Sequence, residues 1–187
     1  MTNRFADASP TPFWASTLPI MHTCAPLTTD ATCDLAIVGG GFTGLWSALK
    51  ARERHPDATI VVLEAKQCGQ DASGRSGGFC APSISHGVSN ALARHPGEAA
   101  TLIRLGQENF DEYARDLDAY GLDVGFARCG KLNLATTAWQ AKGLEEMARN
   151  YERFGIAHQL LHGDALREKL DSPVYGTGLF EPNYGLV

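Results

Sequence analysis

The sequence lacks the clustered Lys and Arg residues that a nucleic-acid-binding surface needs. It contains 16 Lys and Arg against 21 Asp and Glu, for a formal net charge of −5, and its basic residues are scattered along the chain. Proteins that bind nucleic acid gather positive charge on one face or along one helix. We therefore expect this chain to have no nucleic-acid partner.

Long apolar runs and metal-binding patterns are missing too. No window approaches the ~20 apolar residues of a membrane-spanning helix, and the polar residues 1–32 contain no apolar segment typical of a secretory signal. The five cysteines form no C-x-x-C pair and have no nearby His at zinc-ligand spacing. We therefore expect a cytoplasmic protein with reduced thiols, no membrane span and no metal. A disulfide or metal framework stays open as the alternative.

A βαβ unit is predicted in residues 34–63. Residues 34–38 form a short apolar run, and residues 44–55 have the pattern of a helix that ends before Pro56, because residues preceding proline avoid helical angles. Residues 58–63 (ATIVVL) are continuously apolar and β-branched, which is typical of a strand buried on both faces. Two strands joined by a helix within 30 residues predict parallel pairing and an α/β fold.

The rest of the chain alternates between helical and strand patterns. Residues 67–87 are rich in glycine and serine and too long for an ordinary connection. Apolar side chains at helical spacing predict a helix from Glu98 to Tyr120, which Gly121 would end in a left-handed conformation. The remaining predictions are two short strands within 124–135, a helix that opens with a capping box at Thr137 and Gln140 and ends at Gly155, a strand near 159–161, a short helix from Asp164, and a strand near 178–181.

A glycine-rich turn follows the first predicted strand. Gly39, Gly41 and Gly44 form the pattern G-x-G-x-x-G at the start of the predicted helix. The first glycine permits a tight turn, the second lets a pyrophosphate approach the backbone, and the third lets the helix pack closely on the sheet. The helix N-terminus presents its unpaired N–H groups and positive dipole end to the phosphates. The pattern predicts a dinucleotide site that includes the intervening Phe42 and Thr43.

An acidic residue stands where such a site binds the adenosine ribose. Glu64 ends the second predicted strand, 20 residues after Gly44, and Ala65 follows it in the predicted site. A carboxylate there accepts hydrogen bonds from the ribose hydroxyls and repels a 2′-phosphate, which disfavours NADP. NAD and FAD share this fingerprint, so the turn does not distinguish between them.

A second glycine-rich segment favours the longer cofactor. Residues 71–78 (DASGRSGG) offer hydroxyl, guanidinium and main-chain groups to a ligand that extends past its pyrophosphate. The candidate binding residues in this segment are Ser73, Gly74, Arg75, Ser76, Gly77 and Gly78. The alternative is a flexible surface loop with a solvated Arg75.

The residues of these motifs resemble those of a known family. The run DLAIVGGGFTGLWSALKARERHPDATIVVLEA (34–65), together with ASGRSGGF (72–79), resembles the N-terminus of the D-amino-acid-oxidase-like family of FAD-dependent amine oxidoreductases. That family includes glycine and sarcosine oxidases and gamma-glutamylputrescine oxidase, and the last also has an aromatic FW arm before the first strand. The resemblance implies that FAD is the cofactor. It also implies that the glycine turn cradles the pyrophosphate, Glu64 holds the adenosine ribose, and Ser73, Arg75, Gly77 and Gly78 lie along the ribityl chain and the flavin edge.

Two further residues are candidates near the flavin. His86, in the segment SISHG, is a candidate active-site group, with an ordinary loop histidine as the alternative. Cys80 could approach the ring, with a small buried residue as the alternative. In the dimethylglycine and sarcosine dehydrogenase branch, a histidine before the glycine pair carries the flavin covalently. Arg75 stands at that position here, so we expect no covalent attachment through it.

The resemblance implies oxidation of a C–N bond of an amine or amino acid by hydride transfer to flavin N5. Family members are considerably longer, so we expect an incomplete chain with an uncovered sheet edge. Its parts would be an arm (1–32), the first part of a Rossmann-like FAD-binding domain (33–121) and the start of an α+β substrate domain (122–187). The alternatives are an NAD-binding Rossmann dehydrogenase or sensor module, and a truncated nucleotide-binding remnant without catalysis. The sequence does not identify the amine, the electron acceptor or the oligomeric state.

Overall fold

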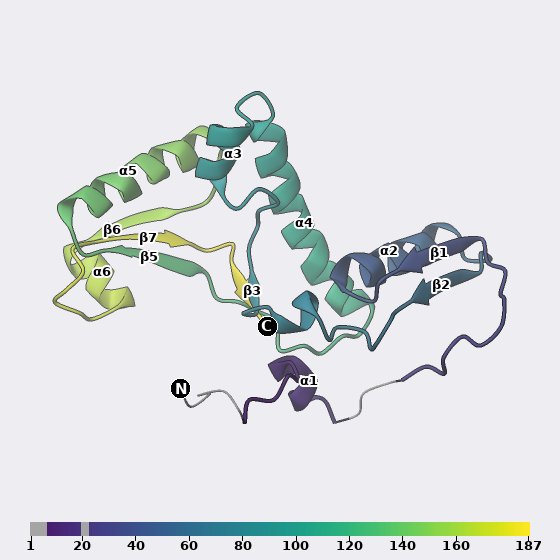
Figure 1. The fold of residues 1–187 in the computed structure, drawn as a ribbon. Coiled ribbons are helices and arrows are strands. Elements are labelled where there is room, and N and C mark those ends of the chain that lie inside the picture. Colours follow the sequence, from purple (N-terminus) through teal and green to yellow (C-terminus); the bar gives the residue numbers. More distant parts are fainter. Residues whose placement is uncertain (1–6, 20–22) are drawn as a thin grey trace. The chain divides into compact units, whose positions relative to one another are not determined.

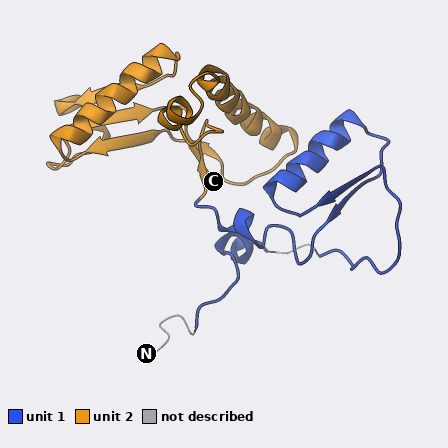
Figure 2. Ribbon diagram, turned by 45° about the horizontal axis from the view of Figure 1, so that its top comes forward, with its two compact units in different colours: residues 1–77 blue, residues 78–187 orange. Residues whose placement is uncertain are grey.

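A βαβ unit forms where the sequence pattern predicts it, in a computed structural model that describes residues 7–19 and 23–187 (Figure 1). Residues 1–6 and 20–22 of the predicted arm lie outside the described residues. The chain forms two units, residues 1–77 and 78–187, coloured separately in Figure 2. Within the described ranges, no helix combines the length and apolar character needed to cross a membrane.

The first unit contains one parallel strand pair and its connecting helix. Its elements are α1 (Phe13–Thr17), β1 (Leu35–Val38), α2 (Phe42–Arg54), β2 (Ile60–Leu63) and the 3-10 helix η1 (Ala72–Arg75). β1 pairs with β2 in parallel, from Leu35 opposite Ile60 to Val38 opposite Leu63. α2 begins at Phe42 rather than at Gly44, because the extended Gly41 already serves as the N-cap.

The prediction of a second strand buried on both faces is wrong for this structure. No residue of β2 is fully buried: the first three have intermediate exposure and Leu63 is 37% exposed, and Val38, at the end of β1, is 86% exposed. The pair forms a two-stranded sheet on which α2 packs. Apolar strand surface is therefore uncovered within the described part of this unit, as expected for an incomplete sheet.

The second unit contains two antiparallel sheets and four helices among its described residues. Its strands are β3 (Phe79–Cys80), β4 (Ala127–Arg128), β5 (Lys131–Ala135), β6 (Gln159–His162), β7 (Thr177–Glu181) and β8 (Gly185–Leu186). Its helices are α3 (Val88–Arg94), α4 (Ala99–Ala119), α5 (Ala138–Arg153) and α6 (Gly163–Lys169). One sheet has the order β3-β8-β4 and the other the order β5-β7-β6.

Local signals set the ends of the two long helices as predicted. The Thr137 side chain accepts from the backbone N–H of Gln140, and the capping box is complete at the start of α5. Gly121 and Gly155 follow α4 and α5 with φ of +64° and +66°. A left-handed residue at this position lets the last helical carbonyls find donors.

The core of the second unit joins residues from both sides of a predicted domain boundary. Buried side chains of α3 and α4, such as Ala91 and Ile103, pack in one cluster with Leu144 and Tyr151 of α5 and with Leu179 of β7. Residues 78–121 therefore pack with the segment that follows them. The boundary between the two units, after residue 77, therefore differs from the boundaries of the three predicted parts (1–32, 33–121 and 122–187). The assignment of those parts to functional domains stays a prediction.

Candidate nucleotide-binding site

The first two residues of the glycine turn form hydrogen bonds to neighbouring backbone. The Gly39 N–H donates to the Leu63 carbonyl over 2.8 Å, and Gly39 has a φ of +103°. The carbonyl of Gly40 accepts from the N–H of Gly69 over 3.0 Å. A left-handed residue is needed where the chain leaves β1, and glycine supplies it without strain.

Two other glycines of the turn lie close to neighbouring atoms. A Cβ at Gly44 would overlap the carbonyl oxygen of Gly39, and it would also contact the Ile37 side chain at 3.4 Å. A Cβ at Gly41 would lie 2.8 Å from the Ser73 hydroxyl oxygen. The backbone overlap requires glycine at Gly44, whereas at Gly41 the Ser73 hydroxyl would have to move. The start of α2 thus lies directly against the turn and against the loop that follows β2.

Glu64 faces the turn. Its Oε2 accepts from the Gly40 N–H over 2.7 Å, and its Oε1 accepts from the Lys66 N–H over 3.0 Å. These backbone donors, that of Gly40 first, hold the pKa of the Glu64 carboxyl below its usual value, because they stabilise the charged form. The side chain is therefore an ionised acceptor beside the turn, and a carboxylate has about four lone-pair sites in all for hydrogen-bond donors.

Ser73 reaches the first turn of α2 from the second glycine-rich segment. Its Oγ accepts from the Phe42 N–H over 3.0 Å, so one otherwise unpaired N–H of the helix start binds a side-chain hydroxyl. The next residue, Gly74, has no room for a side chain. A Cβ there would overlap the Gly69 carbonyl oxygen and lie 3.3 Å from the Pro12 side chain.

The next two residues of the segment contact the N-terminal arm. The Arg75 guanidinium donates from Nη2 to the Pro10 carbonyl over 2.6 Å, and the Ser76 carbonyl accepts from Trp14 Nε1 over 2.8 Å. Neither contact was predictable, since a backbone carbonyl acceptor leaves no signature in the sequence. Gly77 lines a groove beside the arm, whereas the buried Gly78 belongs to the second unit.

The predicted site residues thus divide into three groups. The turn, Glu64 and Ser73 come together in the first unit, with the exposed Thr43 and Ala65 beside them in sequence. Arg75 and Ser76 contact the arm.

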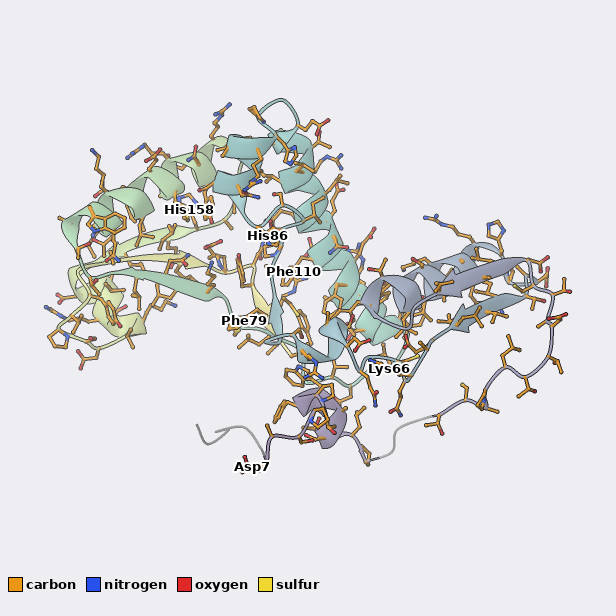
Figure 3. All side chains as sticks on the ribbon, in the orientation of Figure 1. Asp7, Lys66, Phe79, His86, Phe110 and His158 are labelled. Atoms are coloured by element: carbon orange, nitrogen blue, oxygen red, sulfur yellow. The ribbon has the colours of Figure 1, made fainter. Side chains whose placement is uncertain are left out.

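The third group, His86 and Cys80, lies in the second unit. His86, labelled in Figure 3, has a φ of +58° and lines a cavity of about 370 Å³ together with Lys131, Tyr151 and Tyr184. Burial raises the pKa of the Cys80 thiol, and burial together with that thiol raises the pKa of Tyr113 to about 12. A high pKa keeps the thiol protonated near neutral pH, which makes Cys80 a poor nucleophile.

A buried carboxylate in the second unit was not singled out from the sequence. Glu181 is 6% exposed and accepts from Tyr151 Oη over 3.0 Å and from Asn133 Nδ2 over 2.7 Å. Lys131 Nζ lies 3.9 Å from its Oε1. Burial and the adjacent carboxylate raise the pKa of the Tyr151 phenol, so it remains a hydrogen-bond donor. A glutamate at the end of an apolar strand gives no sequence sign that three distant residues surround it.

The donor and acceptor set of the first unit suits a dinucleotide. The turn brings bare backbone to the N-terminus of α2, the Ser73 hydroxyl lies at the same point, and the Glu64 carboxylate lies at the end of the neighbouring strand. Phosphate oxygens need N–H and O–H donors, and ribose hydroxyls need an acceptor. Among residues 7–19 and 23–187, no group of three or more His, Cys, Asp or Glu side chains could hold a metal ion.

Comparisons with known proteins bear on the same residues. Residues 34–187 match the model of the DAO family, described as FAD dependent oxidoreductase. Gamma-glutamylputrescine oxidoreductase of Escherichia coli (strain K12) is 36% identical over 163 residues, which cover 86% of this chain and 38% of that protein. L-2-hydroxyglutarate dehydrogenase of the same organism is 25% identical over 159 residues, covering 82% of this chain and 34% of that protein.

Solved structures share the fold. A glycine oxidase from Geobacillus kaustophilus aligns with a TM-score of 0.60 at 23% identity, covering 83% of this chain and 40% of that one. An L-amino acid deaminase from Proteus myxofaciens in complex with anthranilate aligns with a TM-score of 0.69 at 15% identity, covering 90% and 36%. The chain spans less than half the length of the relatives it matches, and it corresponds to their N-terminal portion.

Proposed function

The chain belongs to the DAO family of FAD dependent oxidoreductases, and on this premise we propose that it forms the cofactor-binding part of an enzyme that oxidises a C–N bond of an amine or amino acid. FAD is the cofactor of this family. When bound, the flavin supplies the redox chemistry by accepting a hydride from substrate. The family match does not favour a NAD-dependent dehydrogenase or sensor module.

The single observation that carries this proposal is the hydrogen bond between Glu64 and Gly40. It places an ionised carboxylate 2.7 Å from the backbone of the glycine turn, at the end of the strand parallel to β1. We assign Glu64 to the adenosine ribose, and the backbone from Gly39 to Gly44 to the pyrophosphate. The Ser73 hydroxyl accepts from Phe42, so its own proton is available to a phosphate oxygen.

The amine or amino-acid substrate is supported by the relatives. The gamma-glutamylputrescine oxidoreductase is more similar to this chain, at 36% identity, than the 2-hydroxyglutarate dehydrogenase, at 25%. We therefore propose a small-molecule amine partner rather than a 2-hydroxy acid. The cytoplasmic location stays a prediction.

A retention experiment tests the cofactor assignment. The 187-residue chain is purified with added FAD and passed over a desalting column, and the flavin absorbance that stays with the protein is measured. We expect FAD to be retained and not to be displaced by excess NAD or NADP. Loss of all flavin, or equal displacement by NAD, would contradict the assignment. Anaerobic bleaching of retained flavin by amines and amino acids, with 2-hydroxyglutarate as the comparison, tests the substrate class.

A further inference from the structure

The N-terminal arm forms two hydrogen bonds to the glycine-rich segment, and the partners in each are more than sixty residues apart in the sequence. Arg75 Nη2 donates to the Pro10 carbonyl over 2.6 Å, at a separation of 65 residues. Trp14 Nε1 donates to the Ser76 carbonyl over 2.8 Å, at a separation of 62 residues. We call this pair of contacts the arm clamp.

Packing accompanies the arm clamp. Pro12 is buried and lies close to Gly74, where an added Cβ would come within 3.3 Å of it. The Phe13 and Trp14 rings meet edge to face, with centroids 5.2 Å apart. Offset and edge-to-face aromatic pairs are attractive beyond the area that they bury. The arm therefore presents a short, ordered surface to the loop, although it contains a helix of only five residues.

The arm clamp and the candidate cofactor site are joined through η1. One residue of η1, Ser73, binds the Phe42 N–H at the start of α2. The last residue of η1, Arg75, binds the arm. Ser73 and Arg75 are two residues apart in the same four-residue 3-10 helix, so a contact that holds Arg75 also restricts the position of Ser73.

We propose that Trp14 and Arg75 are positioning residues for the cofactor, acting through η1 to hold the Ser73 hydroxyl at the N-terminus of α2. The proposal rests on the proposed function, since it takes FAD as the ligand of this site. It also gives Arg75 a role different from the flavin contact predicted from the sequence: its guanidinium holds the arm against the loop.

Limited trypsin digestion tests the arm clamp without FAD. Trypsin cleaves after Arg75, and the Ser76 carbonyl beyond that bond is the acceptor of Trp14. Trp14→Phe keeps an aromatic ring and removes the donor, so cleavage of the 75–76 bond should accelerate. One hydrogen bond of ordinary net strength corresponds to roughly a 2- to 12-fold change. Trp139→Phe, at a 76% exposed tryptophan of α5, is the matched control and should leave the rate unchanged.

FAD titration of the same variants tests the positioning role. Trp14→Phe should weaken FAD binding within the same roughly 2- to 12-fold range. In a Ser73→Ala background it should have no further effect, because the group that it positions is gone; this cycle separates positioning from general destabilisation. Arg75→Met should also weaken binding, and Arg75→Lys, which can still donate to Pro10, should recover part of the loss.

The cleavage and FAD-binding results test the arm clamp and the positioning role separately. Unchanged cleavage in Trp14→Phe would show that the arm clamp does not form. Faster cleavage with unchanged FAD affinity, or an equal loss of affinity in the Ser73→Ala background, would overturn the positioning role. If the parent chain binds no FAD, the proposed function and the positioning role both fail, while the cleavage rates still report whether the clamp exists.

Discussion

Replacing Gly44 by alanine is the sharpest test of how the glycine turn is built. Gly44 is the third residue of α2, and an added Cβ would overlap the carbonyl oxygen of Gly39 while touching Ile37 at 3.4 Å. The colliding atom is backbone, so it cannot rotate aside as a flexible side chain could. Either the turn or the start of α2 must shift.

Two opposing effects set the expected change in the free energy of unfolding of Gly44→Ala. Forcing an extra carbon into a close contact costs about 1–3 kcal/mol, and an overlap with backbone belongs at the upper end of that range. Alanine gains up to about 1 kcal/mol over glycine in a helix interior, and the gain is smaller in the first turn. We therefore expect Gly44→Ala to lower the free energy of unfolding by about 2 kcal/mol, with a parallel loss of FAD retention.

Gly143→Ala provides the matched control. Gly143 lies inside α5, and nothing is within 4 Å of a Cβ placed there. The same substitution should stabilise the chain by roughly 0.5–1 kcal/mol, since only the helix-propensity gain applies. Urea unfolding followed by circular dichroism measures both variants. A Gly44→Ala variant as stable as Gly143→Ala would show that α2 does not lie as close to the turn as the structure has it.

Three further substitutions test the sites. Gly41→Val should abolish FAD retention, because a branched side chain would meet the Ser73 hydroxyl where a phosphate must approach; equal flavin content in mutant and parent would refute the assignment. Glu64→Gln should weaken FAD binding. The variant should also be less stable than the parent at neutral pH, and this difference should disappear as the pH falls below 4.5, because the pKa of Glu64 is depressed in the folded state. Urea unfolding across that range checks the sign, and a difference that grew in acid would contradict it. Tyr151→Phe should cost about 1.5–3 kcal/mol in urea unfolding, since it removes a buried donor from the Glu181 carboxylate; an unchanged midpoint would mean that Asn133 and water suffice.

The local elements were readable because their signals are local. The G-x-G-x-x-G spacing, the apolar runs at 34–38 and 58–63, and the Thr137 capping box each depend on neighbours within a few residues, and each gave an element of the predicted type. β4 lies within the predicted pair of short strands at 124–135, but the sheet β3-β8-β4 was not anticipated, because the two-residue strands β3 and β8 have no periodicity to detect. α3 was missed for a similar reason, since its seven residues continue a glycine- and serine-rich loop.

Burial and long-range pairing were not predictable from the sequence, because both depend on residues far away in the chain. A run such as ATIVVL shows that a strand is apolar, but its burial depends on how many strands and helices cover it. Here the strand lies in a two-stranded sheet on which α2 packs. Nothing in the sequence indicated that the Arg75 guanidinium donates to a carbonyl 65 residues away, and its predicted contact with the cofactor stays a prediction. Pairing at such separations is decided by tertiary geometry, which the spacing of residues does not encode.

The sequence by itself determined the βαβ unit and the shape of its glycine turn, because a glycine pattern between a strand and a helix describes a local backbone conformation. It predicted a dinucleotide at this turn, and FAD followed from the resemblance to the family. The tertiary structure alone decided that Glu64 binds the Gly40 N–H, that Ser73 lies at the start of α2 and that the arm is tied to the loop. These contacts join segments distant in sequence, and only folding brings their donors and acceptors within hydrogen-bond distance.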